Sequence, residues 1–307
     1  MDLSTYNDKN WSNVFVDSNV PDVCKQEPCV VGVDEAGRGP VLGPMVYGIC
    51  FCPVTKHDDL KAAGVADSKT LTEEQREKLF NIIHEKNDYI GWSLEVISPL
   101  YISNCMYKRP KVSLNEISHN AAISLIKRAI SAGVNVSEVY LDTVGPPEKY
   151  QAKVQDIFPT IKVTVEKKAD ALYPCVSGAS ICAKVARDRA LSKWKFPEGI
   201  EIDNWGSGYP GDSVTKNFLM NSLDQVFGFP GIVRFSWSTA EKIVEEKCVP
   251  VAWNEEEDED KKDKTPSVLE YFARKQKSSD GGSVDHPPLK KRHYFFTDRC
   301  LKTVESF

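Results

Sequence analysis

The chain has 307 residues, a formal net charge of −5 at pH 7 and a sequence pI near 5.7. This length allows a sizeable core, and the negative charge excludes a generally basic nucleic-acid coat while leaving room for a local basic patch. The nine cysteines are scattered without a Cys-x-x-Cys pair, so the pattern favours neither a zinc site nor a disulfide framework. Because no signal-peptide pattern or membrane-length apolar run is present, we expect an intracellular protein that makes no membrane contact.

Composition divides the chain into three parts. Residues 1–27 are polar and irregular and predict a flexible N-terminal arm. Residues 28–248 alternate apolar and amphipathic stretches and predict the folded domain. Residues 249–307 predict a polar tail that is largely disordered alone, because it cannot bury enough apolar surface. The tail contains an acidic run at 255–260 and hydrophobic islands that are candidate partner-docking segments.

In the central part, apolar residues that recur every two residues indicate strands, and apolar residues that recur about every 3.6 residues indicate helices. The predicted strands cover residues 30–33, 45–52, 89–97, 138–142 and 161–165. The predicted helices cover 72–86, 113–132, 146–158 and 174–195, with two more near 213–227 and 236–247. Thr70 and Glu73 have the spacing of a capping box for the first helix. Three meander-like strands followed by strand–helix alternation predict an α/β fold with a mixed sheet.

Three of these strands end near acidic residues: Asp34 with Glu35, then Asp142, then Asp170. Ligands collect outside the carboxyl ends of strands in open α/β sheets, so these side chains can converge on one site. Clustered carboxylates repel one another unless cations intervene. Oxygen ligands without His or Cys favour Mg²⁺ or Mn²⁺ over zinc.

A second interpretation of these acids is that each is a turn former that caps the next element. Asp142, which precedes Thr-Val-Gly-Pro-Pro, fits that interpretation especially well. The recurrence at three strand ends favours the clustered metal site. Adjacent residues of a regular strand face opposite sides, so Asp34 and Glu35 share a site only if the chain bends near Ala36 and Gly37.

Candidate recognition residues occur in a tripeptide beside the first acids and at one position much later in the sequence. Gly37-Arg38-Gly39 combines main-chain donors with a guanidinium, which suits phosphate or hydroxyl recognition, although a tight turn with a solvated Arg has the same sequence. Tyr209 is a candidate stacking platform or, alternatively, a loop anchor.

Three basic residues are candidates for phosphate contacts. Lys69 precedes a predicted helix N-terminus, where phosphates bind readily, and Lys184 and Arg187 share one helix face. Solvated surface positions remain the alternative for all three.

Five motifs, in order and spacing, resemble the type 2 ribonucleases H, the ribonuclease HII family. They are residues 33–40 (Val-Asp-Glu-Ala-Gly-Arg-Gly-Pro), 67–69 (Asp-Ser-Lys), 141–142 (Leu-Asp), 168–170 (Lys-Ala-Asp) and 183–188 (Ala-Lys-Val-Ala-Arg-Asp). The resemblance covers roughly residues 28–248. The polar arms and the tail are similar to those of the eukaryotic catalytic subunit rather than the bacterial monomer.

The resemblance implies a ribonuclease H-like fold, with a five-stranded mixed sheet flanked by helices and a C-terminal helical extension. It also implies a set of roles. Two Mg²⁺ ions, or Mn²⁺ as the alternative, would be held by the catalytic residues Asp34, Glu35, Asp142 and Asp170. The ribose 2′-hydroxyl would be contacted by Gly37, Arg38 and Gly39, the junction nucleotide by Tyr209, and phosphates by Lys69, Lys184 and Arg187.

The implied activity is two-metal hydrolysis of the RNA strand of RNA–DNA hybrids, and cleavage at single ribonucleotides embedded in duplex DNA, leaving 3′-hydroxyl and 5′-phosphate ends. The resemblance also implies ribonucleotide and RNA-primer removal in DNA replication and repair, and two non-catalytic subunits in a heterotrimer. Residues 267–272 are similar to a sliding-clamp motif but lack its glutamine, and the basic run 290–292 is typical of a nuclear signal, with the cytoplasm as a further location.

Two other functions stay open on the sequence alone. One is a catalytically inert scaffold within a nucleic-acid complex, which the presence of all four carboxylates and of the Gly-Arg-Gly run disfavours. The other is a hybrid nuclease of type 1 character that needs several consecutive ribonucleotides. A duplex with one ribonucleotide separates these possibilities.

Overall fold

The computed structural model describes residues 1–64, 71–200 and 204–250, and Met1–Cys248 forms one compact unit. Several predictions lie outside the described residues. They concern Lys69, the capping residue Thr70 and the tail from residue 251 onward, including its acidic run, clamp-like segment and basic run.

The centre of the unit is a mixed sheet of six strands in the order β1-β4-β3-β2-β5-β6. The strands are β1 (Val14–Asp17), β2 (Cys29–Ala36), β3 (Met45–Pro53), β4 (Gly91–Ile97), β5 (Val136–Asp142) and β6 (Lys162–Glu166). The first four pair antiparallel, whereas β5 is parallel to β2, and β6 is parallel to β5. The carboxyl ends of β2, β5 and β6 therefore meet at one edge. The predicted α/β class with a mixed sheet is confirmed.

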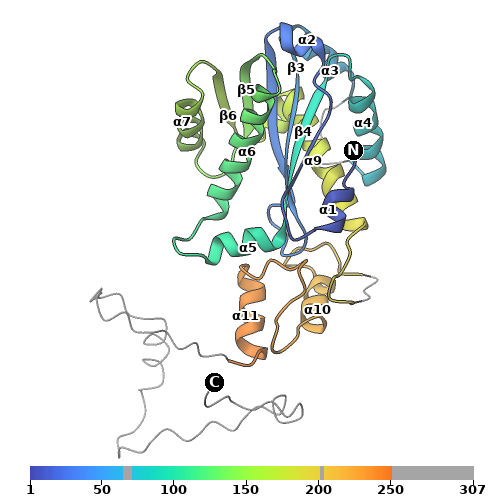
Figure 1. Ribbon diagram of the computed structural model, residues 1–307, viewed down its shortest axis with the longest axis vertical. Helices are drawn as coiled ribbons and strands as arrows, with labels where there is room; N and C mark the ends of the chain where they lie inside the picture. Colours follow the sequence, from blue (N-terminus) through green and yellow to red (C-terminus); the bar gives the residue numbers. More distant parts are fainter. Residues whose placement is uncertain (65–70, 201–203, 251–307) are drawn as a thin grey trace, which may run out of the picture. The chain divides into compact units, whose positions relative to one another are not determined.

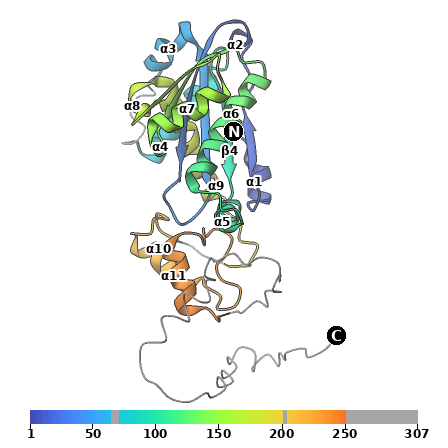
Figure 2. The same ribbon diagram turned by 90° about the vertical axis from the view of Figure 1, so that its left-hand side faces the viewer.

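Helices cover both faces of the sheet (Figures 1 and 2). On one face, α6 (Leu114–Ser131) and α7 (Pro147–Ile157) close an apolar core. On the other face, α9 (Pro174–Ser192) and α4 (Glu73–Glu85) close a second core. This double coverage explains why β3 is buried along its whole length and has a continuous apolar sequence.

The close approach of α9 to β2 requires a glycine. A Cβ on Gly32 would lie 2.1 Å from the main-chain carbon of Cys175. Because that atom belongs to the backbone of α9, no side-chain movement can relieve the clash. The Gly32 position thus fixes how closely α9 lies over the strand that carries Asp34.

Shorter helices complete the unit: α1 (Ser4–Asp8), α2 (Asp22–Gln26), η1 (Val54–Lys56), α3 (His57–Ala62), α5 (Pro99–Tyr107), α8 (Ala169–Leu172), α10 (Ser213–Asn221) and α11 (Ser238–Lys247). The last two form the expected C-terminal helical extension, at the lower end in Figure 1. Their small core includes Val41 and Leu42 from the loop that follows β2. The extension is therefore packed directly against the segment that contains the Gly-Arg-Gly run.

The first 27 residues form regular elements instead of the predicted loose arm. β1 pairs with β4 and adds a sixth strand to the five expected, and Leu3 and Tyr6 are buried. This strand could not be predicted from the sequence, because four residues within a polar stretch are too few to show a clear alternation of apolar and polar residues. β1 is stabilised by its backbone pairing with β4 and by packing against its neighbours. Neither contribution can be read from the strand propensity of its residues.

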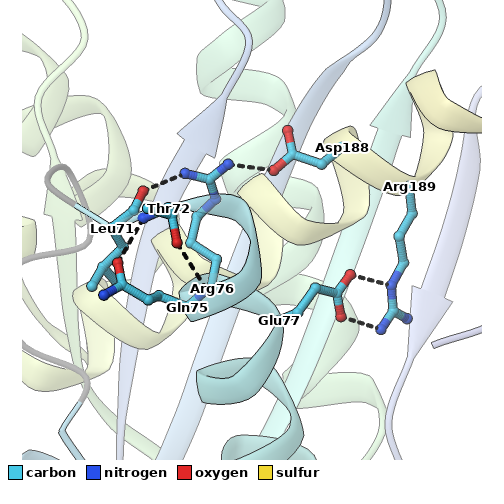
Figure 3. A network of polar contacts seen from close by, with 7 residues as sticks. All are labelled: Leu71, Thr72, Gln75, Arg76, Glu77, Asp188 and Arg189. Atoms are coloured by element: carbon cyan, nitrogen blue, oxygen red, sulfur yellow. Dashed lines mark hydrogen bonds and ion pairs between the residues drawn. The ribbon is translucent and has the colours of Figure 1, made fainter.

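Helix α4 begins two residues later than its predicted cap. Thr72 is the N-cap residue, and Thr72 and Gln75 form the reciprocal capping box. The next turn ties α4 to α9 (Figure 3): Arg76 contacts Asp188 at 2.7 Å, and Glu77 accepts two hydrogen bonds from Arg189. These contacts attach the chain just after residues 65–70 to α9.

No helix in the described ranges is both long and apolar enough to span a bilayer.

Candidate active site

The sheet brings the predicted acids together at the edge where β2, β5 and β6 end. Asp34 lies near the end of β2, and Asp142 is the last residue of β5. Val33 is paired with Leu141, so the two acids that follow them are neighbours on parallel strands. Asp170 lies in the first turn of α8, directly after β6. Three separate strand ends thus supply carboxylates to one region.

Asp34 faces α9 and is only 6% exposed. Its Oδ1 accepts a hydrogen bond from the Glu35 N–H at 2.8 Å, and its carboxyl group is hydrogen-bonded to Ser180 on α9. Burial raises the pKa of Asp34, and the charges of Asp142 and Asp170 raise it further. Burial and the neighbouring charges thus favour the protonated form of Asp34 when no cation is bound.

Glu35 points to the opposite face of the sheet. β2 continues its regular pairing with β3 past this residue, with Glu35 opposite Tyr47, and the chain turns only at Gly37, where φ is +74°. The sequence allowed a bend that would align Asp34 with Glu35, but the regular strand keeps them on different faces. Burial raises the pKa of Glu35, Asp34 and Asp142 raise it further, and Arg38 lowers it. Asp142 therefore acts electrostatically on both acids of β2.

Asp142 makes the turn contact that its sequence position suggested and also bonds to the start of α8. Its Oδ1 accepts hydrogen bonds from the main-chain N–H groups of Thr143 at 3.0 Å and Ala169 at 3.1 Å. The first bond is that of a turn former, whereas the second ties the end of β5 to the start of α8. Asp142 thereby places Asp170 next to its own strand end.

The donor set fits a hard divalent cation because all four side chains offer carboxylate oxygens. Within the described residues, however, no three His, Cys, Asp or Glu side chains are grouped closely enough to hold a single ion together. Glu35, on the opposite face of the strand from Asp34, lies away from the other acid of β2. The acids thus fit cations in chemistry, but not one ion shared by all of them.

The Gly-Arg-Gly loop leaves β2 directly beside these acids. Position 37 requires a glycine, because φ is +74° and a Cβ would lie 2.1 Å from Nε of Arg187. Gly39 faces the ring of Tyr209, whose Cε1 would lie 3.3 Å from an added Cβ. Tyr209 is 53% exposed, so its ring covers Gly39 on one side and is open to solvent elsewhere. The structure brings the predicted sugar-reading loop and the predicted stacking residue together.

A family model described as Ribonuclease HII matches residues 31–240, the segment that contains every site element described above. The chain belongs to the ribonuclease HII family. It is 49% identical over 308 residues to the A subunit of ribonuclease H2 from Mus musculus, and the match covers 100% of each chain. This family membership makes the chain a ribonuclease H enzyme.

Solved structures agree with this assignment. The ribonuclease H2 of Pyrococcus horikoshii is 35% identical with a TM-score of 0.60, over 71% of this chain and 98% of that chain. The ribonuclease HII in the PCNA:RNase HII complex of Archaeoglobus fulgidus is 32% identical with a TM-score of 0.53, over 62% of this chain and 85% of that chain. The predicted ribonuclease H-like fold is confirmed.

The predicted phosphate-binding residues of this ribonuclease HII family member differ in their surroundings. Arg187 donates from Nε to the Pro44 carbonyl at 3.3 Å and from Nη2 to the Leu42 carbonyl at 3.4 Å. Its guanidinium is thus engaged in holding the loop after β2. Lys184 lies half-buried one turn earlier on α9. Their phosphate contacts stay predictions.

Three residues that contact the Gly-Arg-Gly loop were missed from the sequence. Asn115 accepts a hydrogen bond from Arg38, Arg234 donates to loop carbonyls, and Trp237 donates to the Gly39 carbonyl at 3.1 Å. Arg234 and Trp237 lie in an irregular segment without a period, and Asn115 lies in the first turn of α6. Only the tertiary fold brings them to the loop.

Proposed function

We propose that this ribonuclease H is an endonuclease that hydrolyses the RNA strand of RNA–DNA hybrids and also cuts at a single ribonucleotide within duplex DNA. One observation carries the proposal: the Gly-Arg-Gly loop directly follows the strand that holds two of the four acids. The main-chain N–H groups of Arg38 and Gly39 have no hydrogen-bond acceptor in the described part of the chain. A ribose 2′-hydroxyl is the group that distinguishes RNA from DNA, and it can accept such bonds.

The four acids would hold two divalent cations, Mg²⁺ or Mn²⁺. Two ions suit this set of acids because no three of them are grouped for a single ion in the described part of the chain. When bound, such ions supply Lewis-acid activation of water and stabilise charge at the leaving oxygen, which yields 3′-hydroxyl and 5′-phosphate ends. The protein orients the acids in advance: Ser180 positions the carboxyl group of Asp34, and the Ala169 N–H positions that of Asp142.

Tyr209 would contact the nucleotide at the RNA–DNA junction. Its half-exposed ring lies against Gly39, so a nucleotide whose 2′-hydroxyl meets the loop would lie next to the ring. Aromatic rings bind nucleotides through stacking regardless of base, which suits an enzyme that recognises a sugar. Lys184 and Arg187 remain candidate phosphate contacts, and Lys69 is a further candidate outside the described residues.

The chain would work as the catalytic member of a heterotrimer with two non-catalytic subunits. The full-length relatives are named as A subunits, which supports a multi-subunit complex. We further propose a nuclear location, which rests on the basic run 290–292, and a role in ribonucleotide and primer removal during DNA replication and repair. The relative from Archaeoglobus fulgidus was solved in complex with PCNA, which supports testing a clamp contact through residues 267–272.

The experiment uses one duplex with a single ribonucleotide, one with a run of ribonucleotides and one of DNA alone, each with Mg²⁺. We expect cleavage of the first two at the ribonucleotide and none of the third. Asp34→Asn should lower kcat/KM at least about a hundredfold. Asp156→Asn, the same change on the exposed surface of α7, should leave kcat/KM unchanged.

Each alternative predicts a different pattern of cleavage. A type 1-like nuclease would cut only the run of ribonucleotides, and an inert scaffold would cut none of the three duplexes. Full activity of Asp34→Asn would remove Asp34 from the chemistry.

A further inference from the structure

Arg234 is completely buried, and all three of its nitrogen donors serve the loop that follows β2. Nε donates to the Gly43 carbonyl at 2.8 Å, Nη1 to the Arg38 carbonyl at 3.0 Å and Nη2 to the Gly37 carbonyl at 2.6 Å. In the described part of the chain its partners are main-chain oxygens rather than a carboxylate. Burying a guanidinium in this way costs much desolvation free energy, so the arrangement needs an explanation beyond stability.

The contacts fix the direction of two peptide groups. In a planar trans peptide, the C=O and the N–H point in opposite directions. The Gly37 carbonyl belongs to the same peptide unit as the Arg38 N–H, and the Arg38 carbonyl to the same unit as the Gly39 N–H. Because both carbonyls point to Arg234, both N–H groups point away from it. Neither of these N–H groups donates to an acceptor in the described chain.

The loop cannot hold this orientation by itself. Two glycines give its backbone wide freedom, and peptide groups in such a segment can rotate with little steric resistance. Trp237 adds a third restraint, because its Nε1 donates to the Gly39 carbonyl and its ring lies over the Arg234 guanidinium at 4.9 Å. The Arg234 main-chain N–H also donates to the Val41 carbonyl at 2.8 Å. The segment around Arg234 thus restrains the loop from Gly37 to Gly43.

We propose that Arg234 is a positioning residue for ribose recognition: it holds the Gly37–Arg38–Gly39 backbone so that two N–H groups face the 2′-hydroxyl of the substrate. The inference rests on the proposed function of the loop. It assigns a specificity role to the C-terminal helical extension, which otherwise would serve only packing. Arg234 itself touches neither the substrate nor the acids.

The test compares Arg234→Gln, Arg234→Lys and, as a matched control, Arg189→Gln in the full chain. Arg189 makes two hydrogen bonds to Glu77 between α4 and α9 and does not contact the loop (Figure 3). Two readouts are needed: kcat/KM for a duplex with one ribonucleotide, and the inhibition constant of an all-DNA duplex of the same sequence. The second reports duplex binding without ribose recognition.

Loss of two oriented hydrogen bonds should lower kcat/KM of Arg234→Gln about 10- to 100-fold, while the inhibition constant changes less than about twofold. Arg234→Lys should recover part of the loss, because an ammonium can still donate to these carbonyls. Arg189→Gln should match the wild type in both readouts. Unchanged kcat/KM in Arg234→Gln, or a parallel loss of all-DNA binding, would overturn the positioning role.

Trp237→Phe provides the same test if Arg234→Gln does not fold by circular dichroism. It removes the indole donor to the Gly39 carbonyl and keeps a smaller aromatic ring at this position, and we expect a drop in kcat/KM of about 3- to 10-fold with an unchanged inhibition constant. An unchanged kcat/KM in that variant would overturn the inference. Failure of the wild type to cut the ribonucleotide duplex is distinct, because it would refute the proposed function itself.

Discussion

Glu95 lies on β4, opposite Tyr47, in a position where its charge is poorly compensated. Its side chain is 8% exposed, its Oε2 has no hydrogen-bond partner in the described structure, and Asn13 reaches Oε1 only at 3.4 Å. Burial raises the pKa of Glu95 from 4.5 to about 7. We predict that Glu95→Gln stabilises the protein relative to the wild type, and more so at pH 8 than at pH 5.

The sign follows from proton linkage. As pH rises from about 4.5 to about 7, the unfolded state loses the Glu95 proton while the folded state keeps it, so the wild type loses stability across this window. Above pH 7 the full cost of burying the charged Glu95 side chain is present, and this cost disappears when acidification protonates the side chain. A shift of this size corresponds to at most about 3 kcal/mol, and partial relaxation makes about 1–3 kcal/mol the expected difference.

Urea unfolding of the full chain at pH 5 and pH 8 measures the effect. For each protein, the unfolding free energy at pH 8 is subtracted from that at pH 5. The difference is then compared between the wild type and Glu95→Gln, so that any pH-independent effect of the amide cancels. Glu148→Gln removes the same charge at an exposed position of α7 and retains Glu95, so its unfolding free energy should keep the pH dependence of the wild type. Equal pH dependence of wild type and Glu95→Gln would refute the buried-charge reasoning.

Three further predictions concern the site and its support. Gly37→Ala combines a positive φ with a clash against Arg187, so it should destabilise the protein by more than about 1 kcal/mol in urea unfolding and lower kcat/KM with it. Tyr209→Ala should lower kcat/KM on a ribonucleotide duplex far more than it weakens duplex binding, and equal losses in a binding titration would indicate a purely positional role. Arg76→Gln removes the partly buried pair with Asp188 between α4 and α9, and we expect a loss of about 1 kcal/mol in urea unfolding.

Two features could be predicted from the sequence: the helices and strands whose apolar residues recur with a clear period, and the acids at the strand ends. Strands β2 to β6 and the long helices carry strong apolar patterns, and the acids follow from the rule that ligands collect at the carboxyl ends of parallel strands. The sequence also predicted that Asp34 and Glu35 would face opposite sides in a regular strand. It could not tell whether the chain bends there, because Ala36 and Gly37 allow both conformations.

Contacts between distant segments could not be predicted. β1 is too short to show a period and exists because it pairs with β4. Arg187 has the helical spacing of a phosphate-binding residue, yet its guanidinium bonds to loop carbonyls that lie far away in the sequence. Arg234 gives no signal at all, since a buried arginine in an irregular segment looks like a solvated one until the fold shows its partners. Such roles depend on tertiary geometry rather than on local pattern.

The central claim is that one ribose 2′-hydroxyl, recognised by the loop after β2, decides where the four acids act. The most direct measurement compares kcat/KM for two duplexes that differ only in one 2′ substituent, hydroxyl against hydrogen, in the presence of Mg²⁺. A site built to hydrogen-bond a hydroxyl should reject the analogue that lacks it by about 10⁴-fold. Similar cleavage of both duplexes, or cleavage only where several ribonucleotides are adjacent, would contradict the account.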